Sequence, residues 1–301
     1  MIRLLLRKLA QGVMLIFIVS AVTFTMLSSA GGDAFTSLRD NPQISAETIE
    51  NLRRVYGFDR PVAERYGTWL SNVSRGELGE SFYFRTPVSG LVVSRFVSTL
   101  TVSIAALLIA LAIAATLGVL SARYRWKWLS MLIETIIVLT SSTPRLILAL
   151  LGLALMVRFA ELSAFWLAAS ALAAPLVALL LAQFHDGMEQ AMQEDFVQFA
   201  RAKGLSERVV IMRHALRAAL NPVLTIFGLS LGSLLGGSVI VETILGRSGI
   251  GSLMVTAVRN RDIPLLMGIV LVASAAVWLG NALAELLQML NDKRLRSIET
   301  G

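Results

Sequence analysis

Six long apolar stretches alternate with polar segments along the chain. A helix needs roughly 20 mainly apolar residues to cross the hydrocarbon core of a bilayer, and each stretch is that long. The pattern therefore predicts an all-α integral membrane protein with six transmembrane helices. The predicted spans are about Leu9–Ser29, Thr99–Ala122, Leu129–Met156, Ala164–Phe184, Ala219–Ile244 and Pro264–Leu290.

The first stretch can also be compared with a cleaved signal peptide. It follows Arg3, Arg7 and Lys8, and small residues occupy Ser28–Gly32. However, its apolar part is longer than the ~7–15 residues of a signal-peptide core. The length favours a span that is retained.

The basic residues of the short loops predict the orientation, because cytoplasmic loops carry an excess of Lys and Arg. The opposite loops hold only Arg158, Arg247, Arg259 and Arg261. The richer side holds fourteen, which predicts that this side and both termini are cytoplasmic. These are Arg3, Arg7, Lys8, Arg123, Arg125, Lys127, Arg201, Lys203, Arg208, Arg213, Arg217, Lys293, Arg294 and Arg296.

The polar segment 31–97 then lies outside, as a small extracytoplasmic subdomain. It carries eight basic and eight acidic residues, a balance typical of a solvated region. A short helix is predicted over Ser45–Tyr56, and Ser45 or Thr48 can cap it. Tyr66, Trp69, Leu70 and Leu78 are expected to form a small apolar cluster. The predicted organisation is an N-terminal transmembrane helix (1–30), this subdomain (31–97), a five-helix core (98–290) and a cytoplasmic tail (291–301).

Composition agrees with a membrane protein and excludes several other classes. Hydrophobic residues make up 55% of the 301 positions, charged residues 16%, and the mean hydropathy is +0.71, more apolar than soluble domains need. The chain has no cysteine and two histidines, so no metal site is expected. The net charge of +7 is scattered among apolar runs, so nucleic acid is not an expected partner.

The cytoplasmic loop 190–222 is too charged to span a bilayer, yet its apolar residues recur at helical spacing. They include Phe196, Phe199 and Ala200, and then Val209, Met212 and Leu216. Gly204 interrupts the pattern where a helix end favours positive φ, and Ser206 can cap a following helix. The loop is predicted to be a helix, a tight turn and a helix. Such a unit suits either a groove on a soluble partner or the lipid headgroups, and periodicity leaves both open.

The same loop resembles the EAA loop of binding-protein-dependent ABC importer permeases, in the form found in the dipeptide, oligopeptide and nickel subfamily. Gln198 stands where other importer branches have an acidic residue. The matching residues of the first half are Ala200, Arg201, Ala202, Lys203, Gly204, Leu205 and Ser206. Those of the second half are Arg213, His214, Ala215, Leu216, Arg217, Ala219, Leu220 and Pro222.

The resemblance extends over essentially the whole chain. The further matching strings are Leu52–Trp69, Gly76–Ser81, Pro87-Val88, Thr99-Leu100, Val241–Thr243, Gly249–Gly251 and Arg261-Asp262. It implies a type I ABC importer permease fold in a bacterial inner membrane. In this family the loop's short helix sits in a cleft of the ATPase, so the expected coupling residues are Gln198, Phe199, Ala200, Arg201, Ala202, Lys203, Gly204, Leu205, Ser206, Arg213 and His214.

The resemblance also implies partners and cofactors. They are a second, homologous permease in a heterodimer, two ATPase subunits and an extracytoplasmic substrate-binding protein. The chain contains no GxxxxGK[ST] sequence. ATP and magnesium are therefore expected on the partner ATPases, with no cofactor and no catalysis on this chain.

Arg145 lies near the middle of the predicted third span, next to Thr143 and Pro144. A charge there costs on the order of 2.5–3.5 kcal/mol on insertion scales. Thr143 and Arg145 are candidates for the translocation path, where Arg145 would meet an acidic group such as a peptide carboxylate. Alternatively, carbonyls freed at Pro144 or the partner permease satisfy the arginine.

The fifth span carries Gly228, Gly232 and Gly236 at four-residue spacing, which favours close helix packing. Ser230 and Ser233 are further candidates for lining the path. Gly246–Gly249 fits the GxSG pattern of intramembrane serine proteases. Such an enzyme needs a histidine beside the serine, and both histidines are predicted on the opposite side of the membrane from Ser248.

The predicted function is a permease subunit of an ATP-driven importer for peptides, nickel or metal chelates. A self-contained secondary transporter that uses Arg145 for coupling is the alternative. The charged helix–turn–helix loop and the family resemblance favour the motor-driven subunit.

Overall fold

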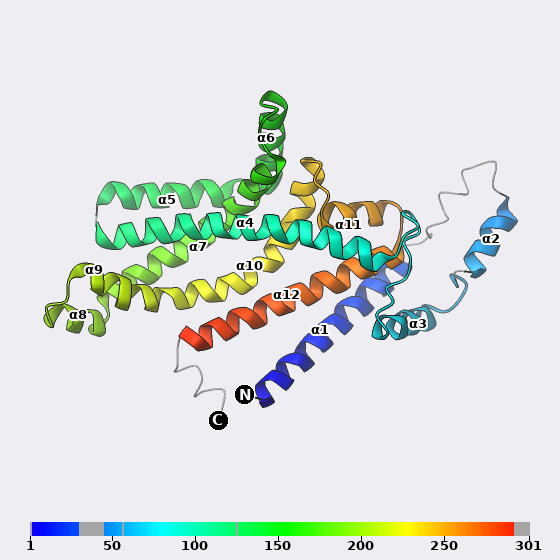
Figure 1. Ribbon diagram of the computed structural model, residues 1–301, viewed down its shortest axis with the longest axis horizontal. Helices are drawn as coiled ribbons and strands as arrows, with labels where there is room; N and C mark the ends of the chain where they lie inside the picture. Colours follow the sequence, from blue (N-terminus) through cyan, green and yellow to red (C-terminus); the bar gives the residue numbers. More distant parts are fainter. Residues whose placement is uncertain (1, 30–44, 56, 125, 292–301) are drawn as a thin grey trace. The chain divides into compact units, whose positions relative to one another are not determined.

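The computed structural model describes residues 2–29, 45–55, 57–124 and 126–291, and the described part is almost entirely helical (Figure 1). Its helices are α1 (Ile2–Ser29), α2 (Ala46–Val55), α3 (Val62–Ser74), α4 (Val88–Arg123), α5 (Lys127–Ser142), α6 (Arg145–Arg158), α7 (Ala164–Gln193), α8 (Asp195–Ala202), α9 (Glu207–Val209), α10 (Leu216–Ile244), α11 (Ile250–Arg259) and α12 (Ile263–Asn291), with a π-helical segment at Val210–Ala215 between α9 and α10.

The prediction of an all-α protein with six spans is confirmed. Five helical segments are long and apolar enough to cross a membrane, and the number is six when the bent pair α5–α6 is counted as one span. The five segments are Leu6–Ser29, Val88–Arg123, Ala164–Gln193, Glu207–Ile226 and Ile263–Asn291.

The prediction of one continuous third span over Leu129–Met156 is wrong. The chain bends by 92° between α5 and α6, and α6 turns sharply away from α5 (Figure 1). Pro144 has no N–H for the helical ladder and disfavours the helical region for the residue before it. Thr143 accordingly takes an extended conformation, with φ −88° and ψ 114°. Arg145 is therefore the first residue of a new helix.

The residues divide into two compact units, and the division falls within α1, α4 and α12. The core unit contains Thr99–Arg247 and the described parts of Met1–Leu4 and Val277–Gly301. The flanking unit contains the described parts of Leu5–Ser98 and Ser248–Ala276. The predicted boundary at residue 97 falls inside α4, which begins at Val88.

Helix α7 forms the centre of the core unit and packs against α5, α6 and α10. Its sequence is apolar over most of its circumference, and Leu172, Leu176, Leu180 and Phe184 are at most 1% exposed. A helix that is hydrophobic on all sides is typical of a buried or membrane-spanning position. The side chain of Ser163 accepts a hydrogen bond from the Phe165 N–H and caps the N-terminus.

Close packing between α10 and α12 explains part of the glycine spacing. A Cβ added to Gly228 would lie 2.8 Å from Cβ of Ala284, so only glycine allows this approach. Gly232 is in looser contact with Val277, and a Cβ at Gly236 would meet nothing within 4 Å. The packing prediction holds for Gly228 and does not extend to Gly236.

A buried hydrogen bond joins α4 to α10 in the core unit. Thr99 Oγ1 donates to Glu242 Oε1 over 2.5 Å, and the two residues are at most 2% exposed. A buried carboxylate requires such donors, because an unpaired one is costly to desolvate. These residues belong to two of the strings that resemble the importer family, and the fold brings those strings together.

The flanking unit contains the predicted short helix and an apolar cluster. The Thr48 N–H donates to Ser45 Oγ over 3.1 Å, so Ser45 caps α2, as predicted. Tyr66 and Trp69 pack against Phe24, Ile263 and Met267. The cluster therefore includes residues distant in sequence, whereas Leu70, which we expected in it, is 38% exposed.

Asp262 organises the start of α12 and the segment before α4. Its Oδ2 accepts hydrogen bonds from Ser81 Oγ (2.6 Å) and the Tyr83 N–H (3.1 Å), and its Oδ1 accepts from the Leu265 N–H (3.2 Å). Ser81 and Asp262 are each 1% exposed. This network unites two more of the matching strings.

Replacing Ser81 with alanine should lower the stability of this unit. The lost bond is to a charged acceptor, which is worth about 1.5–3 kcal/mol, while Asp262 keeps its two backbone donors. We expect Ser81→Ala to lower the midpoint of thermal unfolding in detergent by a few degrees. Ser74→Ala is the matched control, since the exposed Ser74 bonds only to the Ser71 carbonyl. Equal midpoints for the two variants would contradict the expected role.

Candidate functional site

The loop between α7 and α10 begins with helix α8, which ends at Ala202 and is followed by a tight turn at Gly204. The Gly204 N–H donates to the Arg201 carbonyl (2.9 Å) and the Leu205 N–H to the Ala200 carbonyl (3.3 Å). Gly204 has φ +76°, and this pair of bonds is the Schellman arrangement of a helix C-terminus. A Cβ at Gly204 would meet no atom within 4 Å. The turn therefore requires glycine for its backbone conformation.

The second helix of the loop runs into the membrane span without a break. α9 continues through the π-helical segment Val210–Ala215 into α10. Ser206 occupies the N-cap position, but its side chain makes no capping hydrogen bond, contrary to our expectation. Its carbonyl instead accepts from the N–H groups of Val209 and Val210. A displacement of the turn would act directly on α10, because no flexible connection separates them.

Apolar side chains of the loop lie on two different faces. One set packs into the core of the bundle, and Ala200, a predicted coupling residue, belongs to it. This set is Val197, Ala200, Val210, Ile211 and Ala215, each at most 4% exposed. The other set remains on the surface and consists of Phe196 (43% exposed), Phe199 (69%), Leu205 (40%), Val209 (38%) and Met212 (51%). We call the second set the outer face of the loop.

The other predicted coupling residues of the loop are mostly exposed. Ala202, Lys203, Ser206 and Arg213 are exposed, and His214 is half-buried. The Gln198 side-chain amide donates to the Met192 carbonyl over 3.4 Å. The helix–turn–helix predicted for the loop is present, but periodicity does not show which of its residues face outward.

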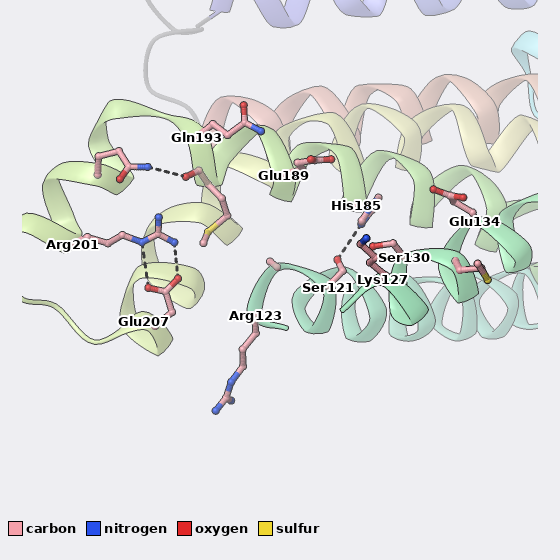
Figure 2. A pocket seen from close by; sticks show the side chains of 14 residues that line it. Ser121, Arg123, Lys127, Ser130, Glu134, His185, Glu189, Gln193, Arg201 and Glu207 are labelled. Carbon is pink, nitrogen blue, oxygen red and sulfur yellow. Dashed lines mark hydrogen bonds and ion pairs between the residues drawn. The ribbon is translucent and has the colours of Figure 1, made fainter. Parts of the chain in front are cut away.

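An ion pair closes the turn across Gly204. Arg201 Nη2 donates to Glu207 Oε1 over 2.6 Å and Arg201 Nε to Glu207 Oε2 over 3.3 Å (Figure 2). The hydrogen bond to Glu207 raises the pKa of Arg201, burial lowers it, and the charge of Glu207 raises it further. The net rise keeps the guanidinium charged.

Breaking this pair should have a small effect, because both side chains are at least 37% exposed and such pairs contribute about 1 kcal/mol or less. We expect Glu207→Gln to lower the stimulated ATPase activity of the assembled transporter by less than about fivefold. Glu194→Gln, at the exposed start of α8, is the control. A tenfold loss would instead assign Glu207 to a direct contact with a partner.

A polar cavity of about 580 Å³ lies beside the loop, between α4, α5 and α7 (Figure 2). His185 was not among the predicted site residues, although its Nδ1 lies 3.0 Å from Ser121 Oγ here. The sequence signal is the polar end of α7, where His185 and Glu189 are one helical turn apart. The lining residues are Ser121, Ala122, Arg123, Lys127, Ser130, Met131, Glu134, His185, Glu189, Met192, Gln193, Gln198, Arg201 and Glu207.

The break in the third span brings Arg145 to α10. Arg145 Nη2 donates to Ser233 Oγ over 2.5 Å, which unites two of the four candidates for the translocation path. Thr143 lies at the break and donates to the Leu139 carbonyl (2.6 Å). Ser230 is 1% exposed, and its side chain donates to the Ile226 carbonyl (2.7 Å) of its own helix.

Gly237 is a further residue of this site that the sequence did not indicate. A Cβ at Gly237 would lie 2.9–3.0 Å from Nη1, Cζ and Nε of Arg145. The guanidinium therefore lies directly on the α10 backbone, one helical turn beyond Ser233. No sequence pattern reveals this contact, because it depends on the bend at Pro144.

A helical bundle with membrane-length apolar helices defines a multi-pass membrane protein. The chain belongs to the binding-protein-dependent transport system inner membrane component family, whose family model matches residues 114–297. The model of the N-terminal part of such membrane components matches residues 1–105. It is thus a permease of the ABC importer type.

Individual relatives agree with this assignment. A Brucella suis biovar 1 (strain 1330) protein whose name describes a peptide permease is 31% identical, over 98% of this chain and 99% of its own. The nickel import system permease protein NikB of Staphylococcus aureus (strain USA300) is 27% identical, over 98% of this chain and 92% of its own. In fold, the chain resembles the crystal structure of an amino acid ABC transporter with histidines, with a TM-score of 0.55 and 19% identity. That likeness covers 66% of this chain and 94% of the other.

Proposed function

We propose that this permease forms half of a translocation path for peptides, nickel or metal chelates and couples it to separate ATPase subunits. The observation that carries the proposal is the outer face of the loop, where Phe199 is 69% exposed. An exposed aromatic ring on a short helix suits a hydrophobic groove on a partner protein. The proposed substrate classes, peptides and nickel, are those in the names of the two relatives described above.

In this proposal α8 sits in a cleft of an ATPase subunit. Closure of the ATPases around bound ATP and magnesium would move α8. The rigid path through the turn, α9 and the π-helical segment would then tilt α10. If α10 has two packed positions, one for each state of the ATPases, the permease alternates between outward-open and inward-open states. The chain itself performs no catalysis.

The assembly proposed is a second homologous permease, two ATPases and an extracytoplasmic substrate-binding protein. The positive-inside distribution supports cytoplasmic termini and a cytoplasmic loop in a bacterial inner membrane. The described part of the segment 31–97, which would then be extracytoplasmic, suits contact with the binding protein.

Reconstitution of the purified assembly in liposomes tests the proposal. We expect uptake to require ATP inside the liposome and binding protein outside, and the binding protein to stimulate ATP hydrolysis. Uptake by this chain alone, driven by an ion gradient, would instead support a secondary transporter.

A further inference from the structure

The break in the third span exposes a polar surface within an apolar segment. Four hydroxyl residues, Thr140–Thr143, precede Pro144. Ser141 and Ser142 are exposed, and Thr143 and Arg145 are half-buried. Broken helical backbone at membrane depth is tolerated only where it faces protein or water. This surface therefore faces the translocation path or another subunit, and not lipid.

Three of the four hydroxyl groups of this surface donate hydrogen bonds to carbonyls of their own helix. Thr140 donates to the Ile136 carbonyl (2.7 Å), Ser141 to Val138 (3.2 Å) and Thr143 to Leu139 (2.6 Å). These bonds occupy carbonyls of the last turns of α5. They provide no negative charge for Arg145.

The guanidinium of Arg145 is held in place but its charge is not neutralised within the described chain. A guanidinium has five N–H donors, and the bond to Ser233 uses one of them. Its Nε is buried without a hydrogen-bond partner. Among the described residues, no carboxylate forms an ion pair with Arg145. A charge in a span is costly, so a fixed arginine with unused donors implies an anionic partner from outside the chain.

We propose that Arg145, held by Ser233 and Gly237, binds a carboxylate group of the transported substrate. The inference rests on the proposed function and deepens it by assigning a chemical class to the cargo. A guanidinium recognises a planar carboxylate through paired hydrogen bonds. The carboxylate belongs either to the C-terminus of a peptide or to the chelator of a metal complex.

Substrate uptake by the reconstituted assembly separates these sources. One arm compares trialanine with trialanine amide, and the other compares nickel citrate with nickel chloride. The binding protein can have its own preference, but it is the same for every permease variant. The change in the ratio of carboxylate to non-carboxylate uptake therefore reports on the permease alone.

We expect Arg145→Gln to lower uptake of the carboxylate form roughly tenfold, as for one lost charge-assisted bond, and to leave the other form within about twofold. Arg145→Lys, which keeps the positive charge, should lower uptake of the carboxylate form less than Arg145→Gln does. Gly237→Ala, which keeps the charge but displaces the guanidinium, should change the ratio in the same direction as Arg145→Gln. Arg158→Gln, in the exposed last turn of α6, is the matched control.

Several outcomes would overturn the inference. One such outcome is that Arg145→Gln lowers uptake of the carboxylate and non-carboxylate substrates equally, and another is that it prevents assembly in a way that Arg145→Lys does not. Either result would assign Arg145 to a carboxylate of another subunit. If the unmodified assembly takes up only trialanine amide or only nickel chloride, a carboxylate cargo is excluded. Absence of binding-protein-stimulated ATP hydrolysis in that assembly would refute the proposed function instead.

Discussion

Replacing Gly204 with valine is expected to uncouple the transporter while leaving it assembled in the membrane. Gly204 has φ +76°, a conformation in which a β-branched residue is a severe outlier. The cost is about 2 kcal/mol, which corresponds to roughly thirtyfold in the population of the native turn. Since the turn joins α8 to the helix that continues into α10, its loss would misplace α8, while the packing of α7 against α5, α6 and α10 should be retained. We expect ATP-driven uptake to fall roughly thirtyfold, with binding-protein affinity unchanged.

Asparagine at the same position is the informative control. Asn tolerates the left-handed region better than other non-glycine residues, and a Cβ at Gly204 would contact nothing within 4 Å. Gly204→Asn should therefore retain most of the uptake. Equal uptake by the Val and Asn variants would show that the backbone conformation of the turn is not required for coupling.

The turn at Gly204 also shows what the sequence can reveal. Helix ends depend on a few neighbouring residues, so Gly204 and the short helix capped by Ser45 were predictable from local pattern. The six spans were predictable because hydrocarbon requires long apolar helices. In each case the deciding interaction acts within a few residues or with the solvent.

Features that depend on tertiary contacts were not predictable. Ala200 looked like a contact residue, yet it packs into the bundle at 4% exposure, because apolar periodicity does not distinguish a core from a partner. The contact of the Arg145 guanidinium with the backbone at Gly237 requires the bend at Pro144. Hydropathy averaged over a window conceals that bend, since both arms of the broken span are equally apolar.

The strings that resemble the importer family acquire a physical explanation from the fold. Ser81 bonds to Asp262, and Thr99 bonds to Glu242, although each pair is more than a hundred residues apart. Each buried carboxylate needs its donor, so neither string is independent of its counterpart. The resemblance of these four strings thus reflects internal hydrogen bonding, whereas the apolar side chains of the outer face remain 38–69% exposed in the described part of the chain.

Replacing Phe199 with alanine is expected to weaken binding of the ATPase subunits by roughly 30-fold to 1000-fold. Phe199 is the most exposed side chain of the outer face, at 69%, and truncation of an aromatic anchor in a partner's groove costs about 2–4 kcal/mol. The bundle should fold normally, because the ring is largely outside its core. Titration of the detergent-solubilised permease pair with purified ATPase subunits measures the effect.

The matched control is Phe159→Ala, which removes a ring 52% exposed at the end of α6. We expect this variant to bind the ATPases as the unmodified chain does, because α6 and α8 lie at opposite ends of the predicted membrane topology. If Phe199→Ala also binds normally, the outer face does not enter an ATPase groove. The loop would then be an amphipathic segment on the lipid headgroups, since its exposed apolar side chains must be covered by one surface or the other.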